Sequence, residues 1–155
     1  MLGSFNKRSS ETTRYSADDV VAMLGLVPHP EGGYYREMFR DEKKNDAGRS
    51  ASTSIYYLLT QGQTLHWHRV DAAEVWHWYG GAALVLETFN GKELTKFRVS
   101  GNLMEGERPQ LVIPAKCWQT ASTTGEWTLV GCTVAPGFES AGCEMAPPGW
   151  QPSAQ

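Results

Sequence analysis

Two histidines and a glutamate in the middle of the chain have the types and the spacing that site chemistry needs. His66 and His68 are two residues apart, and Glu74 follows shortly after them. Side chains two apart in a β-strand point to the same face. A strand here would therefore aim both imidazoles at one place, within reach of Glu74 on the next strand. Such a group can bind a divalent metal ion or move a proton.

The composition is that of a globular domain without a nucleic-acid or membrane signature. The chain has 155 residues, 41% of them hydrophobic and 20% charged, which predicts one domain with a hydrophobic core. A net charge of -3 and the absence of a basic cluster argue against binding of a nucleic-acid polymer, whose phosphates need Lys and Arg. No apolar run approaches the roughly 20 residues that span a bilayer, so we expect no membrane partner.

The N-terminus and the cysteines predict a cytoplasmic protein. The first residues lack the apolar segment of a secretory signal. Cys117, Cys132 and Cys143 are odd in number and form no CxxC pair, so neither a disulfide framework nor a zinc knuckle is expected. We interpret them as small buried hydrophobic residues in a reducing compartment.

The elements that must position the site are short strands. The chain is predicted to divide into a flexible N-terminal tail over residues 1–15, a single domain over 16–146 and a C-terminal tail over 147–155. Ser16 and Asp19 form a capping-box pattern that starts one short helix, which Gly25 would end.

Alternation and turn signals then indicate strands over 34–40, 51–60, 65–70, 74–79, 83–89, 94–99, 109–113, 117–121, 127–134 and 143–145. Asn90-Gly91 is a strong hairpin signal. Many short strands with turns between them predict an antiparallel β-sandwich or barrel, and a barrel can surround a small ligand with its inward side chains.

The order of these residues resembles the two motifs of the cupin superfamily. The first motif is matched, with slightly shifted spacing, by Gly62, His66, His68, Glu74 and either Gly80 or Gly81. The second is matched by Gly106, Pro114, Lys116 and Gln119, where Lys116 replaces a glycine and Gln119 replaces a histidine.

Longer phrases, among them Pro28-His-Pro-Glu-Gly-Gly33 and Pro109-Gln-Leu-Val-Ile-Pro114, are similar to the cupin-five branch, a domain of unknown function. The resemblance covers roughly residues 20–145. It implies an all-β, double-stranded β-helix (cupin jelly-roll) barrel with one short N-terminal helix, commonly paired into homodimers. The branch also resembles deoxysugar epimerases that act on nucleotide-linked sugars. A shared fold does not establish a reaction, so function is argued from the site.

Two catalytic hypotheses are open for this site. His66, His68, Glu74 and Gln119 could hold a divalent transition metal (Fe, Mn, Ni or Zn), which is the arrangement of a metal-dependent oxygenase. Alternatively, His68 could act as a base that Glu74 orients, with Tyr57 or Tyr35 as the opposing acid, which is isomerase or epimerase chemistry.

A third hypothesis is binding of a small polar ligand, a sugar or nucleotide derivative, with or without catalysis, as in a non-catalytic binding or storage-like protein. Trp67 and Trp76 could stack on such a ligand, although large aromatic residues in strands belong mostly to the core. Arg36 could hold an anionic group or form an ion pair.

Three neighbouring residues are assigned other positions. His77 has the opposite parity to Glu74, so it should point away from the cavity unless a bulge reverses it. We interpret His29, between two prolines, as a loop residue. Glu31 could shape a turn or cap the mouth of the barrel.

Overall fold

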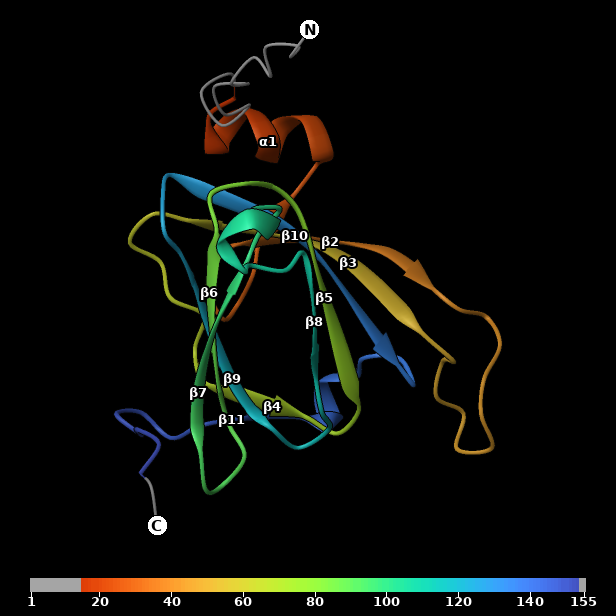
Figure 1. Cartoon of the computed structure of the whole chain (residues 1–155). Coiled ribbons are helices and arrows are strands. Elements are labelled where there is room, and N and C mark those ends of the chain that lie inside the picture. Colours follow the sequence, from red (N-terminus) through yellow and green to blue (C-terminus); the bar gives the residue numbers. More distant parts are fainter. Residues whose placement is uncertain (1–14, 154–155) are drawn as a thin grey trace, which may run out of the picture.

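The structure, a computed structural model, describes residues 15–153. All but the last residue of the predicted N-terminal tail lie outside this range, as do the last two residues of the C-terminal tail. Within it the chain forms two sheets that face each other as a barrel, with one α-helix at one end (Figure 1). The six-stranded sheet has the order β1 (Val27–Pro28), β2 (Tyr34–Arg40), β3 (Thr53–Thr60), β10 (Trp127–Ala135), β5 (Ala73–Gly81) and β8 (Gln110–Ile113). The five-stranded sheet has the order β11 (Cys143–Met145), β4 (His68–Val70), β9 (Trp118–Thr123), β6 (Leu84–Phe89) and β7 (Leu94–Val99).

The helix α1 (Ala17–Leu24) begins and ends where its local signals predict. The Ser16 side chain accepts from the Asp19 amide, the Asp19 side chain accepts from the Ser16 amide, and Gly25 caps the end at φ 65°. Its apolar side packs over the outer face of the six-stranded sheet, where Val20 is buried against Leu58 and Trp127. Two short 3₁₀ helices, Leu103–Glu105 and Ser140–Gly142, complete the elements.

The predicted all-β fold with one short α-helix is confirmed, and the hairpin signal is confirmed with it. Asn90 lies between β6 and β7, and its side-chain oxygen accepts from the amides of Lys92 and Glu93 at 2.9 and 2.8 Å. Every strand pair is antiparallel.

The stretch around the two histidines differs from its prediction. A strand over 65–70 was expected, but β4 starts only at His68, where Gln119 of β9 and Met145 of β11 pair with it on either side. The chain then crosses between the sheets at Asp71 and Ala72, so β4 and β5 are not partners. This crossing places His68 and Glu74 on opposite sheets of the barrel.

The hydrophobic core fills one part of the barrel and adjoins a polar cavity. Leu84, Leu86, Val99 and Val130 are completely or almost completely buried in it. Trp76 belongs to this core and also lines the cavity, so it forms the boundary between them.

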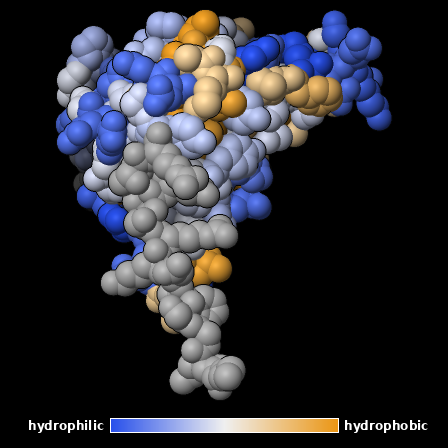
Figure 2. All heavy atoms as spheres, turned by 90° about the horizontal axis from the view of Figure 1, so that it is seen from above, coloured by the Kyte–Doolittle hydropathy of each residue, from blue (hydrophilic) through white to orange (hydrophobic). Residues whose placement is uncertain are grey.

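After β11 the chain has no helix or strand up to residue 153, yet it packs on the barrel. Trp150 lies against Trp118 and Trp67, with ring centroids 4.9 and 5.7 Å apart. On the outer surface, Figure 2 shows hydrophobic side chains gathered in a stripe on an otherwise largely hydrophilic face. Among residues 15–153, no helix is long and apolar enough to cross a membrane.

Candidate functional site

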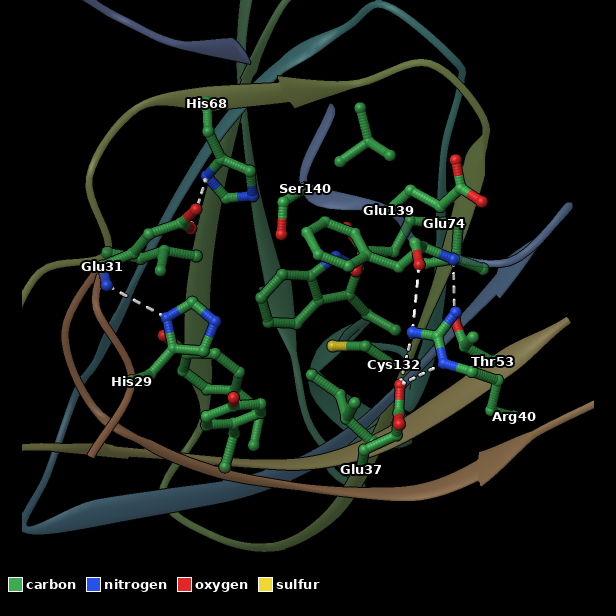
Figure 3. A pocket seen from close by; sticks show the side chains of 18 residues that line it. His29, Glu31, Glu37, Arg40, Thr53, His68, Glu74, Cys132, Glu139 and Ser140 are labelled. Carbon is green, nitrogen blue, oxygen red and sulfur yellow. Dashed lines mark hydrogen bonds and ion pairs between the residues drawn. The ribbon is translucent and has the colours of Figure 1, made fainter. Parts of the chain in front are cut away.

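A cavity of about 430 Å³ opens inside the barrel, and polar side chains from both sheets and two loops face it (Figure 3). Its histidines are His29 and His68, and its carboxylates are Glu31, Glu37, Glu74 and Glu139. Trp76, Tyr35, Tyr57 and Phe138 supply aromatic surface. The site therefore combines ionisable groups with apolar faces, which is typical of pockets for small molecules.

His68 lies at the first position of β4, is buried, and faces this cavity. Its Nδ1 is 2.8 Å from the backbone oxygen of His66 and 3.5 Å from Oε2 of Glu31. Because a carbonyl oxygen can only accept, Nδ1 must carry the proton when the ring is neutral. The lone pair of the neutral ring is then on Nε2, which has no hydrogen-bond partner among the residues that the structure describes.

His29 comes from the loop between β1 and β2, and its ring also lines the cavity. Its Nδ1 accepts from the backbone amide of Glu31 at 3.0 Å. The ring packs edge-on against Tyr35, with centroids 4.6 Å apart, and lies 5.1 Å from the ring of Tyr57. Burial lowers the pKa of His29, and the nearby charge of His68 lowers it further, while Glu31 opposes the shift.

The loop that carries His29 can fold this way because of its glycines. Gly33 has φ +77°, and a Cβ at this position would stand 2.6 Å from the carbonyl oxygen of Leu58. Only glycine allows so close an approach of the loop to β3. Sequence reasoning missed His29 because the Pro and Gly pattern indicates a loop and does not show where that loop packs.

Glu74 lies at the opposite side of the cavity, where it is buried and belongs to a chain of buried hydrogen bonds. Gln119 donates from Nε2 to Oε1 of Glu74 at 2.7 Å, and its Oε1 accepts from Nε1 of Trp76 at 3.0 Å. Burial raises the pKa of Glu74 above its usual value, although His68 and the bond from Gln119 oppose this shift. The predicted site residues His68, Glu74 and Trp76 are thus brought together around one cavity, and Gln119 supports two of them.

The four expected metal ligands do not converge, and the reason is the late start of β4. His66 precedes the strand, is exposed, and donates from Nε2 to the backbone oxygen of Ala146 at 2.8 Å. Gln119 has both of its side-chain groups engaged. Across residues 15–153, no group of three or more His, Cys, Asp or Glu side chains is placed to hold a metal ion. The donor set therefore does not fit a resident divalent metal.

Three other residues that the sequence predicts to contact a ligand make different contacts in the structure. Tyr57 lines the cavity, but its hydroxyl donates to the carbonyl oxygen of Gly32, and burial raises its pKa, so it is a poor proton donor to a ligand. Arg36 lies outside, where Nη1 donates to the carbonyl oxygen of Leu24 at 3.0 Å and ties β2 to α1. Trp67 also lies outside, against Trp150.

His77 is not among the cavity residues and stacks on Tyr79, with ring centroids 6.4 Å apart, as its parity predicts. Alternation within β2 is the local signal that identifies two further cavity residues. Tyr35 and Glu37 both line the cavity, and a register shift after Glu37 brings Arg40 to the same side.

The charge of the cavity wall is negative. Arg40 is the one Lys or Arg among the cavity-lining residues, against four glutamates. Its Nη2 already donates to Oε1 of Glu37 at 2.6 Å and to the backbone oxygen of Phe138 at 3.1 Å. A phosphorylated ligand would therefore meet carboxylates without a free cation to offset them.

Comparison with known proteins agrees with this fold. The sequence matches the family described as Cupin superfamily (DUF985) over residues 18–146. A hypothetical protein from Leishmania major is 30% identical with a TM-score of 0.80, covering 85% of this chain and 88% of that one. A protein from Shewanella oneidensis is 36% identical with a TM-score of 0.81, covering 85% of each chain.

More distant structures share the fold alone. Oxalate decarboxylase from Bacillus subtilis is 14% identical with a TM-score of 0.58, covering 76% of this chain and 29% of that one. A search among curated proteins found no match.

Proposed function

Because the chain belongs to the cupin superfamily, in the family described as DUF985, we propose that its barrel binds a small uncharged polar ligand of the sugar type. We further propose that His68 moves a proton on this ligand, which is the chemistry of an isomerase or epimerase. The observation that carries the proposal is the orientation of His68. Its Nδ1 is held by a carbonyl oxygen, and its other ring nitrogen, Nε2, faces the cavity (Figure 3).

Size and lining support a sugar-like ligand. A volume of about 430 Å³ lies in the range of roughly 300–1,000 Å³ that is usual for ligand pockets. Aromatic faces such as Trp76 and Tyr35 can pack on the apolar side of a sugar ring, and carboxylates can accept from its hydroxyls.

Charge favours an unphosphorylated sugar over the nucleotide derivative that was the other expectation. Glu31 and Glu139 line the cavity, and Arg40 is engaged by Glu37. Bringing a diphosphate beside them would add like charges at short range. The metal-dependent oxygenase is not favoured, because its expected ligands do not converge.

Exchange of carbon-bound hydrogen with solvent tests the proposal. The protein would be incubated in D₂O with a panel of free aldoses and ketoses, and deuterium at carbon followed by NMR. We expect exchange with at least one sugar, and a loss of about 100-fold or more in H68Q, the usual contribution of a general base. H66Q is the matched control, because His66 belongs to the same His-x-His but lies outside the cavity.

A sugar that shifts the melting temperature of the wild type but shows no exchange would favour the remaining alternative, a non-catalytic binding or storage-like protein. Equal exchange by H68Q and the wild type would place the chemistry on another residue.

A second copy of this chain is the partner that we propose for the outer face of the six-stranded sheet. Phe39, Tyr79 and Val112 project from this face beyond the part that α1 covers, and each is about half exposed. Exposed apolar groups on one sheet face are common at subunit interfaces. We expect sedimentation to show a dimer, and we expect Tyr79→Glu to make it dissociate; a monomeric wild type would refute this.

A further inference from the structure

Two imidazole nitrogens of opposite hydrogen-bonding character face the cavity from one wall. Figure 3 shows His29 and His68 on the same side of the cavity, with Glu31 between them. Nε2 of each ring has no hydrogen-bond partner in the described part of the chain, so both are available to a ligand.

The backbone decides which nitrogen carries a proton. A carbonyl oxygen lies at Nδ1 of His68, so this nitrogen is the donor and Nε2 is the acceptor in the neutral ring. A backbone N–H points at Nδ1 of His29, so this nitrogen is the acceptor and Nε2 carries the proton. One ring thus offers a base to the cavity, and the other offers a donor.

Glu31 couples the two rings. Its amide donates to His29, and its carboxylate Oε2 lies 3.5 Å from Nδ1 of His68. The carboxylate can therefore stabilise a positive charge that develops on His68, while the amide of the same residue keeps His29 in its donor form. Because burial lowers the pKa of His29, this ring stays an uncharged donor near neutral pH.

Resting on the proposed sugar-type ligand, we propose that His29 is a second catalytic residue and that the substrate is an α-hydroxy carbonyl compound, an aldose or a ketose, that undergoes a 1,2-proton shift. Nε2 of His68 takes the proton from the carbon that bears the hydroxyl. The bonding electrons move to the carbonyl oxygen, and Nε2–H of His29 donates a hydrogen bond to the resulting enediolate oxygen.

The imidazolium of His68 then returns the proton to the former carbonyl carbon. The proton of the original hydroxyl passes to the neighbouring oxygen, which leaves an isomeric α-hydroxy carbonyl compound. No atom is gained or lost, and no oxidant or cofactor is needed. A neutral imidazole is known to polarise a carbonyl in this way.

The placement of His29 and His68 on one wall suits a 1,2-shift, whereas inversion by two opposing groups would call on Glu74 across the cavity, whose Oε1 already accepts from Gln119. A two-base epimerisation needs a proton donor across the ligand from His68. Tyr57, the expected opposing acid, donates to Gly32 and has a raised pKa. A 1,2-shift needs one base that reaches both carbons from one face and a donor at their oxygens, and the neighbouring positions of His68 and His29 suit these two roles (Figure 3).

The first test uses the ligand-free protein and does not depend on activity. Long-range ¹H–¹⁵N NMR spectra of the histidine rings distinguish the two neutral tautomers, and His77, outside the cavity, serves as a reference. We expect neutral His29 to be protonated at Nε2 and neutral His68 at Nδ1. The opposite tautomer at either ring would overturn the assignment of donor and base.

The second test measures deuterium exchange at carbon with free aldoses and ketoses, comparing the wild type, H29Q and H68Q, with H77Q as the matched control. We expect H29Q to lower kcat by about 100-fold, as for loss of one donor to an oxyanion, with a much smaller change in KM. Loss of exchange in H68Q with unchanged exchange in H29Q would overturn the role of His29 and leave the proposed function intact. No exchange in the wild type with any sugar of the panel would overturn both.

Discussion

Gln119 stands where the cupin pattern has a histidine, and replacing it by methionine should reveal what it does here. Gln119 is 1% exposed and bonds to both Trp76 and Glu74. Methionine has a similar volume, so the main loss is that of two hydrogen-bond partners in the interior. Each buried group left without a partner costs about 1–3 kcal/mol. We therefore expect Gln119→Met to lower the free energy of unfolding by about 2–6 kcal/mol.

The loss of stability in Gln119→Met should also depend on pH. The bond from Gln119 lowers the pKa of Glu74, whereas burial raises it. Without that bond the folded-state pKa rises further above the unfolded value, so stability is lost as the pH rises through the folded-state pKa. The variant should therefore fall further behind the wild type at pH 8 than at pH 5.

Urea unfolding followed by fluorescence and circular dichroism measures both effects. Gln110→Met on β8 is the matched control, because Gln110 is exposed and its replacement should change stability by no more than about 0.5 kcal/mol. A decrease of less than about 1 kcal/mol for Gln119→Met, at the same pH and with the same slope against urea, would refute a structural role for the Trp76–Gln119–Glu74 chain.

Further predictions concern the carboxyl group of Glu74 and the loop that contains Gly33. Because burial raises the pKa of Glu74 above 4.5, the free energy of unfolding of the wild type should decline as the pH rises above that value. E74Q should flatten the decline by up to about 1.4 kcal/mol per pH unit, and unchanged slopes in unfolding titrations would contradict this. Gly33→Ala should lower the free energy of unfolding by more than about 3 kcal/mol, because its Cβ would meet the Leu58 carbonyl oxygen at 2.6 Å. Gly62→Ala is the matched control, because Gly62 has φ +84° and an added Cβ would meet nothing within 4 Å. It should lower the free energy of unfolding by only about 1–2 kcal/mol. Equal losses of stability for the two variants in thermal unfolding would contradict the clash with the Leu58 carbonyl.

The strands and the helix were predictable because their signals are local. Alternation over 34–40 and 94–99 gives strands with those bounds, and the capping residues of α1 act on amides within one turn. The bounds of the other predicted strands differ by up to three residues, most at β4, which starts at His68, and β1 (Val27–Pro28) has no counterpart among the predicted strands. Even the orientation of His77 followed from parity within β5.

The residue pattern alone was sufficient to predict an all-β cupin barrel with His68, Glu74 and Trp76 facing its interior. Whether His66 would join them depended on where β4 begins, and that is set by Gln119 on β9 and Met145 on β11, which lie far along the chain. Because β4 begins after His66, this side chain lies outside the cavity, and the metal site suggested by the two histidines does not form among the described residues.

His29 reaches the site through a long-range contact, the packing of its Pro- and Gly-rich loop against β3, and the same contact decides between the two positions that the sequence left open for Glu31. The proton positions on His29 and His68 were likewise decided by two backbone groups, one amide and one carbonyl, whose directions exist only in the folded chain. A sequence can show that imidazoles are present, but which nitrogen of each ring faces a ligand as base or as donor is a property of the fold.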